Sequence, residues 1–260
     1  MRMKSAAARG PKTSWEGVAG WYGRHLEKDG TFQEAVVFPG AERLLSPVPG
    51  KRYLDIACGE GAFSRQIARR PGIRVSGFDA APSLIARAKR LAPKNADYLV
   101  ADAKAFADRY PPAAFDGASC ILAIQNIDEI GPVFRDAARV LKPGSAFVLV
   151  MNHPSFRQPR QSGWGWDEGR KLQYRRVDKY LGAYDVPIQA HPGSAPDVVT
   201  HSFHRPLQAY VKALSASGFV LADLEEWSSH RVSDSGPKAR AENASRTEIP
   251  MFLALVARKK

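Results

Sequence analysis

Cysteine is scarce in this chain of 260 residues, which contains only Cys58 and Cys120. Both fall in segments that predict buried strands, as expected for reduced thiols rather than a disulfide scaffold. Long apolar runs are missing too, and none reaches the roughly 20 residues that a membrane-spanning helix needs. Residues 1–14 are basic and alanine-rich but lack the apolar core of a secretion signal. We expect a disordered tail there, in preference to a transit peptide, and a cytoplasmic protein with no membrane partner.

Acidic residues are in deficit, because 38 lysines and arginines outnumber 26 aspartates and glutamates and leave a net charge of +12. Such an excess raises the question of a nucleic-acid partner. Much of it, however, lies at the two chain ends and on the expected outer faces of helices, where solvated charge is ordinary. No segment interleaves basic and aromatic residues as RNA-binding modules do. Nucleic acid is therefore a less favoured partner than a small molecule.

Helix-like and strand-like segments alternate through most of the chain. Helices are expected at 15–26, 32–45, 62–70, 82–91, 129–141 and 206–217, and strands at 51–57, 73–79, 96–100, 115–124, 145–151, 219–227 and 251–258. Apolar strands separated by helices predict a parallel sheet covered on both faces. The last two strands are joined by a long polar connection with no evident helix. We therefore expect them to pair antiparallel at the edge of the sheet.

Residues 153–205 do not fit this alternation. About fifty residues is far longer than an ordinary connection, and the segment is rich in Trp, Tyr, His, Arg, Pro and Gly. A long aromatic insertion after a central strand predicts a functional cap over a substrate site.

The most informative motif is Tyr53-Leu-Asp-Ile-Ala-Cys-Gly-Glu-Gly61. It predicts a strand, a glycine turn and a helix, a geometry that lets the backbone pass close to a nucleotide-like ligand. A nicotinamide-binding loop would have a third glycine where Ser64 stands, and a phosphate loop would end in Gly-Lys-Ser/Thr. Asp55 would also face a pyrophosphate unfavourably. The carboxylate suits a cationic ligand better.

Several further segments follow in a familiar order: Gly77-Phe-Asp79, Val100-Ala-Asp-Ala103, Phe115-Asp116 and Leu141-Lys-Pro-Gly144. Together with the glycine motif, this set resembles class I S-adenosylmethionine-dependent methyltransferases, most closely their type 11-like, small-molecule branch. The resemblance covers roughly 48–151 and the C-terminal strands. It implies an α/β, Rossmann-like, doubly wound sheet of seven strands, mostly parallel with an antiparallel C-terminal strand. It also implies one methyltransferase domain over 15–260, with an N-terminal helical lid at 15–46 and the cap insertion at 153–205.

The resemblance implies roles for individual residues in binding S-adenosylmethionine and its product S-adenosylhomocysteine. Gly59 and Gly61 would allow close backbone approach, and Asp55 would face the ammonium group. Asp79 would accept hydrogen bonds from the ribose hydroxyls, and Asp102, with the Ala103 amide, would bind adenine. The remaining expected cofactor contacts are Tyr22, Ala57, Cys58, Ala80 and Gln125. Ala57 stands where many members of the family have glycine, which matters only if this residue needs a positive φ.

Residues for catalysis and acceptor binding are expected near the strand tips and in the cap. His153, which follows the fifth strand, and His204 are candidate acid–base groups, although each could instead be hydrogen-bonded to loop backbone or cap a helix. The candidate acceptor-binding residues are Asn126, Arg157, Trp164, Tyr174 and Arg176. The aromatic members could equally form a small core for the cap. Six scattered histidines do not make a metal site, so none is expected.

The expected function is transfer of a methyl group to oxygen, nitrogen or carbon of a small organic acceptor that is aromatic or anionic. The fourth strand lacks the Asn/Asp-Pro-Pro-aromatic motif of adenine amino-methylation, and neither cysteine has the context of a covalent pyrimidine methylator. Two alternatives stay open: an RNA or protein methyltransferase, for which the +12 charge speaks, and a methyltransferase-like binding protein without catalysis.

Overall fold

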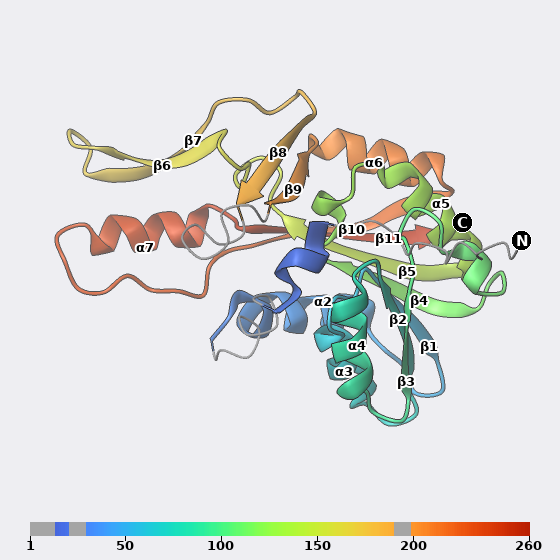
Figure 1. Cartoon of the computed structure of the whole chain (residues 1–260). Helices are drawn as coiled ribbons and strands as arrows, with labels where there is room; N and C mark the ends of the chain where they lie inside the picture. The colour runs from blue at the N-terminus through green and yellow to red at the C-terminus, as the bar shows by residue number, and fades with distance from the viewer. Residues whose placement is uncertain (1–13, 21–29, 190–198) are drawn as a thin grey trace, which may run out of the picture.

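The computed structural model describes residues 14–20, 30–189 and 199–260 (Figure 1). The expected basic tail, apart from Ser14, and the candidate cofactor contact Tyr22 lie outside the described residues. Within those ranges no helix is both long and apolar enough to cross a membrane.

A seven-stranded sheet forms the centre of the molecule, in the order β10-β11-β5-β4-β1-β2-β3. Its strands are β1 (Arg52–Ile56), β2 (Arg74–Asp79), β3 (Ala96–Val100), β4 (Phe115–Ile121), β5 (Leu141–Asn152), β10 (Phe219–Trp227) and β11 (Phe252–Lys259). β11 pairs antiparallel with both of its neighbours, and the other pairs are parallel. This confirms the predicted doubly wound sheet with its antiparallel C-terminal strand. The carboxyl ends of β1 to β5 therefore lie along one edge.

Helices cover both faces of the sheet (Figure 1). They are α2 (Phe38–Leu45), α3 (Ala62–Ala68), α4 (Pro82–Arg90), α5 (Ile130–Val140), α6 (Leu207–Ala216) and α7 (Ala239–Glu248), with short turns of helix η1 (Ser14–Val18), η2 (Gln33–Val37), η3 (Ala107–Arg109) and η4 (Ile124–Asn126). The alternation of side chains along a strand divides the core between the two faces. On β5, Phe147 and Leu149 pack with α5 and α6, whereas Val148 and Val150 pack with α2 and α3.

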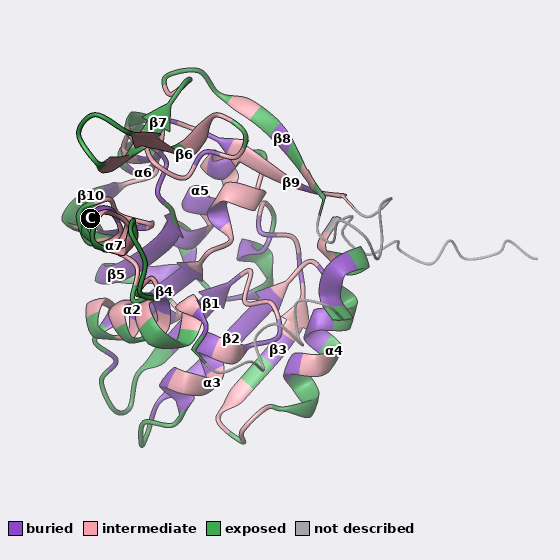
Figure 2. Ribbon diagram, turned by 90° about the vertical axis from the view of Figure 1, so that its left-hand side faces the viewer, coloured by how far each residue is buried: buried purple, intermediate pink, exposed green. Residues whose placement is uncertain are grey.

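The residues of both layers of this core are buried, as the central strands in Figure 2 show. Phe78, Phe134 and Phe147 are completely buried on one face, and Ile67 and Val148 on the other. Burying apolar surface at roughly 25 cal/mol per Å² is the main stabilising contribution in such a fold. Because the strands are packed on both faces, the edge of the sheet is a firm support for the loops at the strand ends.

The prediction that no helix separates the last two strands is wrong, because α7 lies in that connection. Its sequence, Ala-Arg-Ala-Glu-Asn-Ala-Ser-Arg-Thr-Glu, is rich in helix formers but has no apolar stripe, so periodicity gave no signal. α7 packs against β7 rather than against the main sheet. The antiparallel pairing of β10 with β11 is nevertheless confirmed.

The insertion at 153–205 folds as two β-hairpins. β6 (Ser162–Asp167) pairs with β7 (Leu172–Val177), and β8 (Tyr184–Gln189) pairs with β9 (Val199–His204), both antiparallel. The first hairpin and α7 extend together away from the sheet (Figure 1), and their residues are mostly of intermediate burial or exposed (Figure 2). The second hairpin turns towards the carboxyl ends of the sheet strands. The two halves of the insertion therefore occupy different places.

Candidate functional site: an acidic cavity at the strand ends

A cavity of about 340 Å³ opens where β1, β2 and β4 end and the chain leaves β3. Ligands in open α/β sheets bind beyond the carboxyl ends of the strands, and this cavity lies there. η1 and α2 supply Trp15 and Phe38 to its wall, and β9 supplies His201 and Phe203.

The turn after β1 is shaped by three residues with positive φ: Ala57 (+54°), Gly59 (+57°) and Gly61 (+75°). Asp79, at the end of β2, accepts the Gly59 N–H and the Ala81 N–H, both at 2.9 Å. A Cβ on Gly61 would come within 2.7 Å of the Tyr98 ring, so glycine is required there on two grounds. Ala57 does adopt a positive φ, which is the condition under which alanine is less favourable than glycine at this position.

Asp55 lies on the floor of the cavity and is almost completely buried. Its carboxylate accepts hydrogen bonds from Ser64 Oγ at 2.6 Å and Ser119 Oγ at 2.9 Å. The second bond follows from register, because Asp55 and Ser119 are directly opposed on β1 and β4. Burial raises the pKa of Asp55 to about 6 despite both hydroxyls. A cation placed beside this group would offset the cost of its charge.

Asp79 and Asp102 add two more carboxylates to the wall. Burial raises the pKa of Asp79, and the backbone N–H groups of Ala81 and Gly59 oppose that shift. Asp102 accepts the Lys104 N–H at 2.9 Å, which fixes the turn after β3. Each carboxylate accepts only one or two of the several hydrogen bonds its oxygens can take, so acceptor capacity is left for a ligand.

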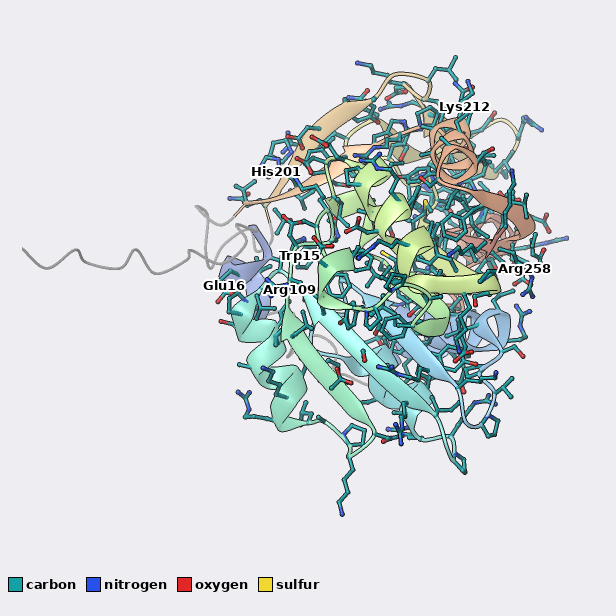
Figure 3. The ribbon with its side chains drawn as sticks, turned by 90° about the vertical axis from the view of Figure 1, so that its right-hand side faces the viewer. Trp15, Glu16, Arg109, His201, Lys212 and Arg258 are labelled. Carbon is teal, nitrogen blue, oxygen red and sulfur yellow. The ribbon has the colours of Figure 1, made fainter. Side chains whose placement is uncertain are left out.

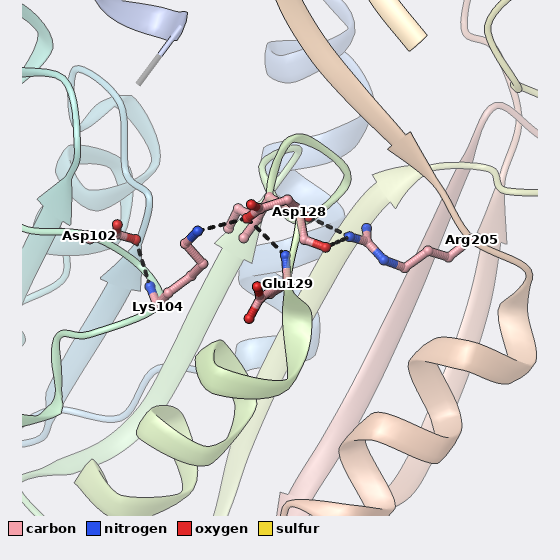
Figure 4. Close-up of polar contacts among 6 residues, drawn as sticks. Asp102, Lys104, Asp128, Glu129 and Arg205 are labelled. Atoms are coloured by element: carbon pink, nitrogen blue, oxygen red, sulfur yellow. Dashed lines mark hydrogen bonds and ion pairs between the residues drawn. The ribbon is translucent and has the colours of Figure 1, made fainter. Parts of the chain in front are cut away.

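Lys104 and Asp128 line the cavity and are partly exposed, and we call this pair the lip of the cavity. Figure 4 shows the polar contacts around them. Lys104 Nζ lies 2.9 Å from Asp128 Oδ1, and this oxygen also accepts the Glu129 N–H. Arg205 donates to the carbonyls of Ile127, at 2.7 Å, and Asp128. The loop after η4 is thus tied to the segment that follows β9.

The lining of the cavity is acidic although the chain is basic. It includes Asp55, Asp79, Asp102 and Asp128 against one lysine, Lys104, which is already paired. The excess of carboxylates in a partly desolvated space favours a cationic ligand. These carboxylates suit a ligand that carries an ammonium or sulfonium charge and hydroxyl donors, as S-adenosylmethionine does.

The structure brings together most of the residues expected to bind a cofactor. Those that line the cavity are Asp55, Ala57, Cys58, Gly59, Asp79, Ala80, Asp102 and Ala103, together with the expected acceptor contact Asn126. Cys58 lies in the turn and not, as expected, in a buried strand. Gly61 shapes the turn without lining the cavity. Gln125 is not in the lining either, because its Nε2 donates back to the Leu122 carbonyl at 2.7 Å.

Neither candidate acid–base histidine reaches the cavity. His153 Nε2 lies 2.6 Å from Glu226 Oε1, and its Nδ1 accepts the Ser155 N–H. His204 Nε2 lies 2.7 Å from the Tyr180 carbonyl, and its ring stacks on Tyr184. Burial lowers the pKa of both groups. The structure therefore supports the alternative that each histidine is held by local hydrogen bonds.

The expected acceptor residues of the first hairpin also lie outside the cavity lining. Arg157 and Arg175 pack over the Trp164 ring, with guanidinium carbons 5.5 and 5.1 Å from its centroid. Tyr174 is exposed, and Arg176 is paired with Asp178 at the surface. Arg157, Trp164 and Arg175 thus form a small cluster at the β6–β7 hairpin, and Tyr174 and Arg176 lie on its other face. The physical reason is topological: only the second hairpin folds back over the sheet edge.

Sequence reasoning missed several large apolar residues of the cavity lining. They are Trp15, Phe38, Ile121, Leu122, Ile127 and Phe203, with His201 beside them. Alternation could have grouped Val199, His201 and Phe203 on one face of a strand. Nothing local indicates that this face meets residues more than a hundred positions away.

Comparisons with known proteins agree with this geometry. Residues 54–149 match the family model described as methyltransferase domain. The chain is 36% identical over 112 residues to a 2-phytyl-1,4-naphtoquinone methyltransferase from Synechococcus elongatus, across 41% of this chain and 48% of that protein. It is 31% identical over 105 residues to a ubiquinone biosynthesis O-methyltransferase from Xanthomonas campestris pv. campestris, across 39% and 43%. The chain thus spans about half the length of the curated relatives it matches.

The likeness in structure extends much further along the chain. An S-adenosylmethionine-dependent methyltransferase from Mesorhizobium loti superposes with a TM-score of 0.71 and 29% identity, over 89% of this chain and 99% of that one. The sequence match and the structural match coincide on the strands and turns that build the acidic cavity. Residues 54–149 therefore match a methyltransferase domain, and the chain as a whole has the fold of the S-adenosylmethionine-dependent methyltransferase from Mesorhizobium loti.

Proposed function

We propose that the protein transfers a methyl group from S-adenosylmethionine to a small organic acceptor. The observation that carries this proposal is the convergence of Asp55, Asp79 and Asp102 on one cavity beside the glycine turn. Three strand-end carboxylates match the ammonium, ribose and adenine groups of that cofactor. The names of the relatives support the same activity.

The cofactor would supply an activated methyl group, and the chain would supply position. Asp79 would accept from the ribose hydroxyls while it holds the Gly59 N–H, and Asp55 would face the cationic end. Asp102 and the Ala103 backbone would receive the adenine. Orienting two reactants in this way is worth up to roughly 7–11 kcal/mol of the barrier.

The acceptor in this proposal is an apolar, aromatic molecule. Its place would be against the apolar lining residues Phe38, Ile127 and Phe203. The quinone-related names of two relatives point to the same chemistry. The expectation of an anionic acceptor loses its basis, since Arg176 lies on the other hairpin, Arg157 packs on Trp164 of that hairpin, and neither lines the cavity.

Calorimetric titration with S-adenosylhomocysteine tests the proposal. The intact chain should bind it, and Asp79→Ala should bind at least about tenfold more weakly, a loss of about 1.4 kcal/mol. Asp97→Ala is the matched control, because Asp97 lies on β3 outside the cavity lining and bonds Ser76 Oγ. Failure of the intact chain to bind would reject the proposal. If the intact chain does bind, incubation with isotope-labelled S-adenosylmethionine in metabolite extracts would identify the acceptor as the compound that gains the label.

A further inference from the structure

The hairpin of β8 and β9 presents one face to the cavity. In its register Phe203 opposes Asp185 and His201 opposes Pro187, so these four residues share a face. His201 and Phe203 line the cavity, and β9 packs against η1 and η4. Figure 3 shows His201 on this hairpin, on the same side of the molecule as Trp15 of η1. The opposite face carries Ser202 and His204.

His201 is held in one orientation by a carboxylate. Its Nδ1 lies 2.8 and 2.9 Å from the two oxygens of Asp185, which occupies the diagonal position on β8. A carboxylate accepts, so Nδ1 carries the proton and donates it. The lone pair is then on Nε2, for which the described residues provide no hydrogen-bond donor. This is the arrangement in which a carboxylate orients an imidazole as a base.

Other titratable groups around the cavity are less suited to accept a proton. Asp128 raises the pKa of Lys104 by hydrogen bonding, so the lysine stays charged, and the same contact lowers the pKa of Asp128. Asp55, Asp79 and Asp102 are the residues matched to the cofactor. His201 lies beside Phe203, with their ring centroids 6.1 Å apart, on the strand that packs against η4.

We propose that His201, oriented by Asp185, is the general base that deprotonates a hydroxyl group on an aromatic acceptor. The inference rests on the proposed function and narrows its acceptor to a phenol-like hydroxyl compound. The O–H proton moves to His201 Nε2 as the oxygen bonds the methyl carbon. The carbon–sulfur bond breaks, and its electron pair stays on sulfur. His201 then loses the proton to water, to which 42% of its side chain is exposed.

Phenol ionisation provides a test that needs no turnover. The full chain is saturated with S-adenosylhomocysteine and mixed with 4-nitrophenol at a series of pH values. Below the pH at which the free phenol ionises, the bound phenol should already show the visible absorbance of its phenolate, since proton transfer to His201 leaves an imidazolium that stabilises it. His201→Gln should abolish this band and Asp185→Asn should weaken it. Ser202→Ala, on the other face of the same strand, should retain it.

Three controls make the outcome decisive. Calorimetry with S-adenosylhomocysteine should give the same affinity for all variants, and their melting temperatures should match. Methylation of the labelled acceptor should fall by about 10²- to 10⁴-fold in kcat for His201→Gln. A phenolate band that survives His201→Gln, or its absence from the intact chain, would overturn the inference. If the intact chain does not bind S-adenosylhomocysteine, the proposed function fails and the inference fails with it.

Discussion

The Asp79 carboxylate accepts the backbone N–H of Gly59 at 2.9 Å, so the end of β2 holds the turn that follows β1. The other oxygen accepts the Ala81 N–H at the same distance. One side chain therefore positions two loops of the cavity before any ligand arrives. Asp79 is also the residue proposed to bind the ribose, so a substitution there should change both the stability of the protein and its affinity for the cofactor.

Asp79→Asn should destabilise the protein even without ligand. An amide has one acceptor oxygen, so its NH₂ group must face one of the two backbone N–H groups. Leaving a buried donor unsatisfied costs about 1–3 kcal/mol. Urea unfolding should show a loss in this range, and Asp97→Asn, on the neighbouring strand, should show a smaller one. Equal losses in the two variants would mean that Asp79 does not hold the turn.

Ala57→Gly should stabilise the protein, because Ala57 has a φ of +54°. Left-handed backbone costs an L-residue roughly 1–2 kcal/mol, and glycine avoids this at some cost in chain entropy. The expected net gain is a fraction of that range. Ala86→Gly is the matched control, because Ala86 is exposed within α4 and should lose about 1 kcal/mol. Thermal unfolding should show a gain in stability for Ala57→Gly and a loss for Ala86→Gly. A loss in both variants would contradict the backbone strain at Ala57.

Gly61→Ala should cost much more than Gly50→Ala. Both glycines have a positive φ, +75° and +81°, so the backbone strain is similar. A Cβ on Gly50 meets nothing within 4 Å, whereas one on Gly61 meets the Tyr98 ring at 2.7 Å. Overpacking adds roughly 1–3 kcal/mol to the strain. Chemical unfolding of both variants measures that difference, and similar losses would show that the Tyr98 ring moves aside.

Asp55 should make stability depend on pH. Burial raises its pKa to about 6 from 3.8, so the folded state binds a proton more tightly than the unfolded chain. Stability therefore falls as pH rises from about 4 to about 6, and the cost above that window is of the order of 3 kcal/mol. Asp55→Asn should remove this contribution.

The measurement is the free energy of unfolding at several pH values for the intact chain and for Asp55→Asn. Asp79 also has a raised pKa, and subtracting the two curves leaves the Asp55 contribution. The difference should grow across the window and then stay constant. A flat difference curve would mean that Asp55 keeps its ordinary pKa. Bound S-adenosylhomocysteine should reduce the dependence, because its ammonium group favours the carboxylate.

The sequence was sufficient for the sheet and for the acidic, strand-end part of the cavity lining, because both depend on local signals. A strand that ends in an aspartate, such as β2 at Asp79, can be recognised from neighbouring residues. Parallel strands then bring such ends to one edge without further information. The turn at Gly59 is local in the same sense.

The large apolar residues of the cavity lining could not be predicted in this way. Trp15, Phe38 and Phe203 come from three distant segments and share no motif. The aromatic richness of residues 153–205 suggested a cap but could not show which of two hairpins folds over the sheet. Trp164 was therefore expected at the site, and it lies instead between arginines on the other hairpin. His153 was expected to be an acid–base group because of its position in the chain, whereas the geometry favours His201 for that role.

Arg205 ties the loop after η4 to the segment that follows β9, and its replacement should loosen the lip of the cavity. Its Nη2 donates to the carbonyls of Ile127 and Asp128, whose side chains line the cavity (Figure 4). Hydrogen bonds from a charged donor contribute about 1.5–3 kcal/mol, so Arg205→Met should lose about that much stability. Arg160→Met is the matched control, since Arg160 makes a single exposed bond to the Pro187 carbonyl of the same hairpin. The loss should be accompanied by faster amide hydrogen exchange at 126–129 in Arg205→Met alone. Unchanged exchange there would show that the Lys104–Asp128 ion pair holds the lip without Arg205.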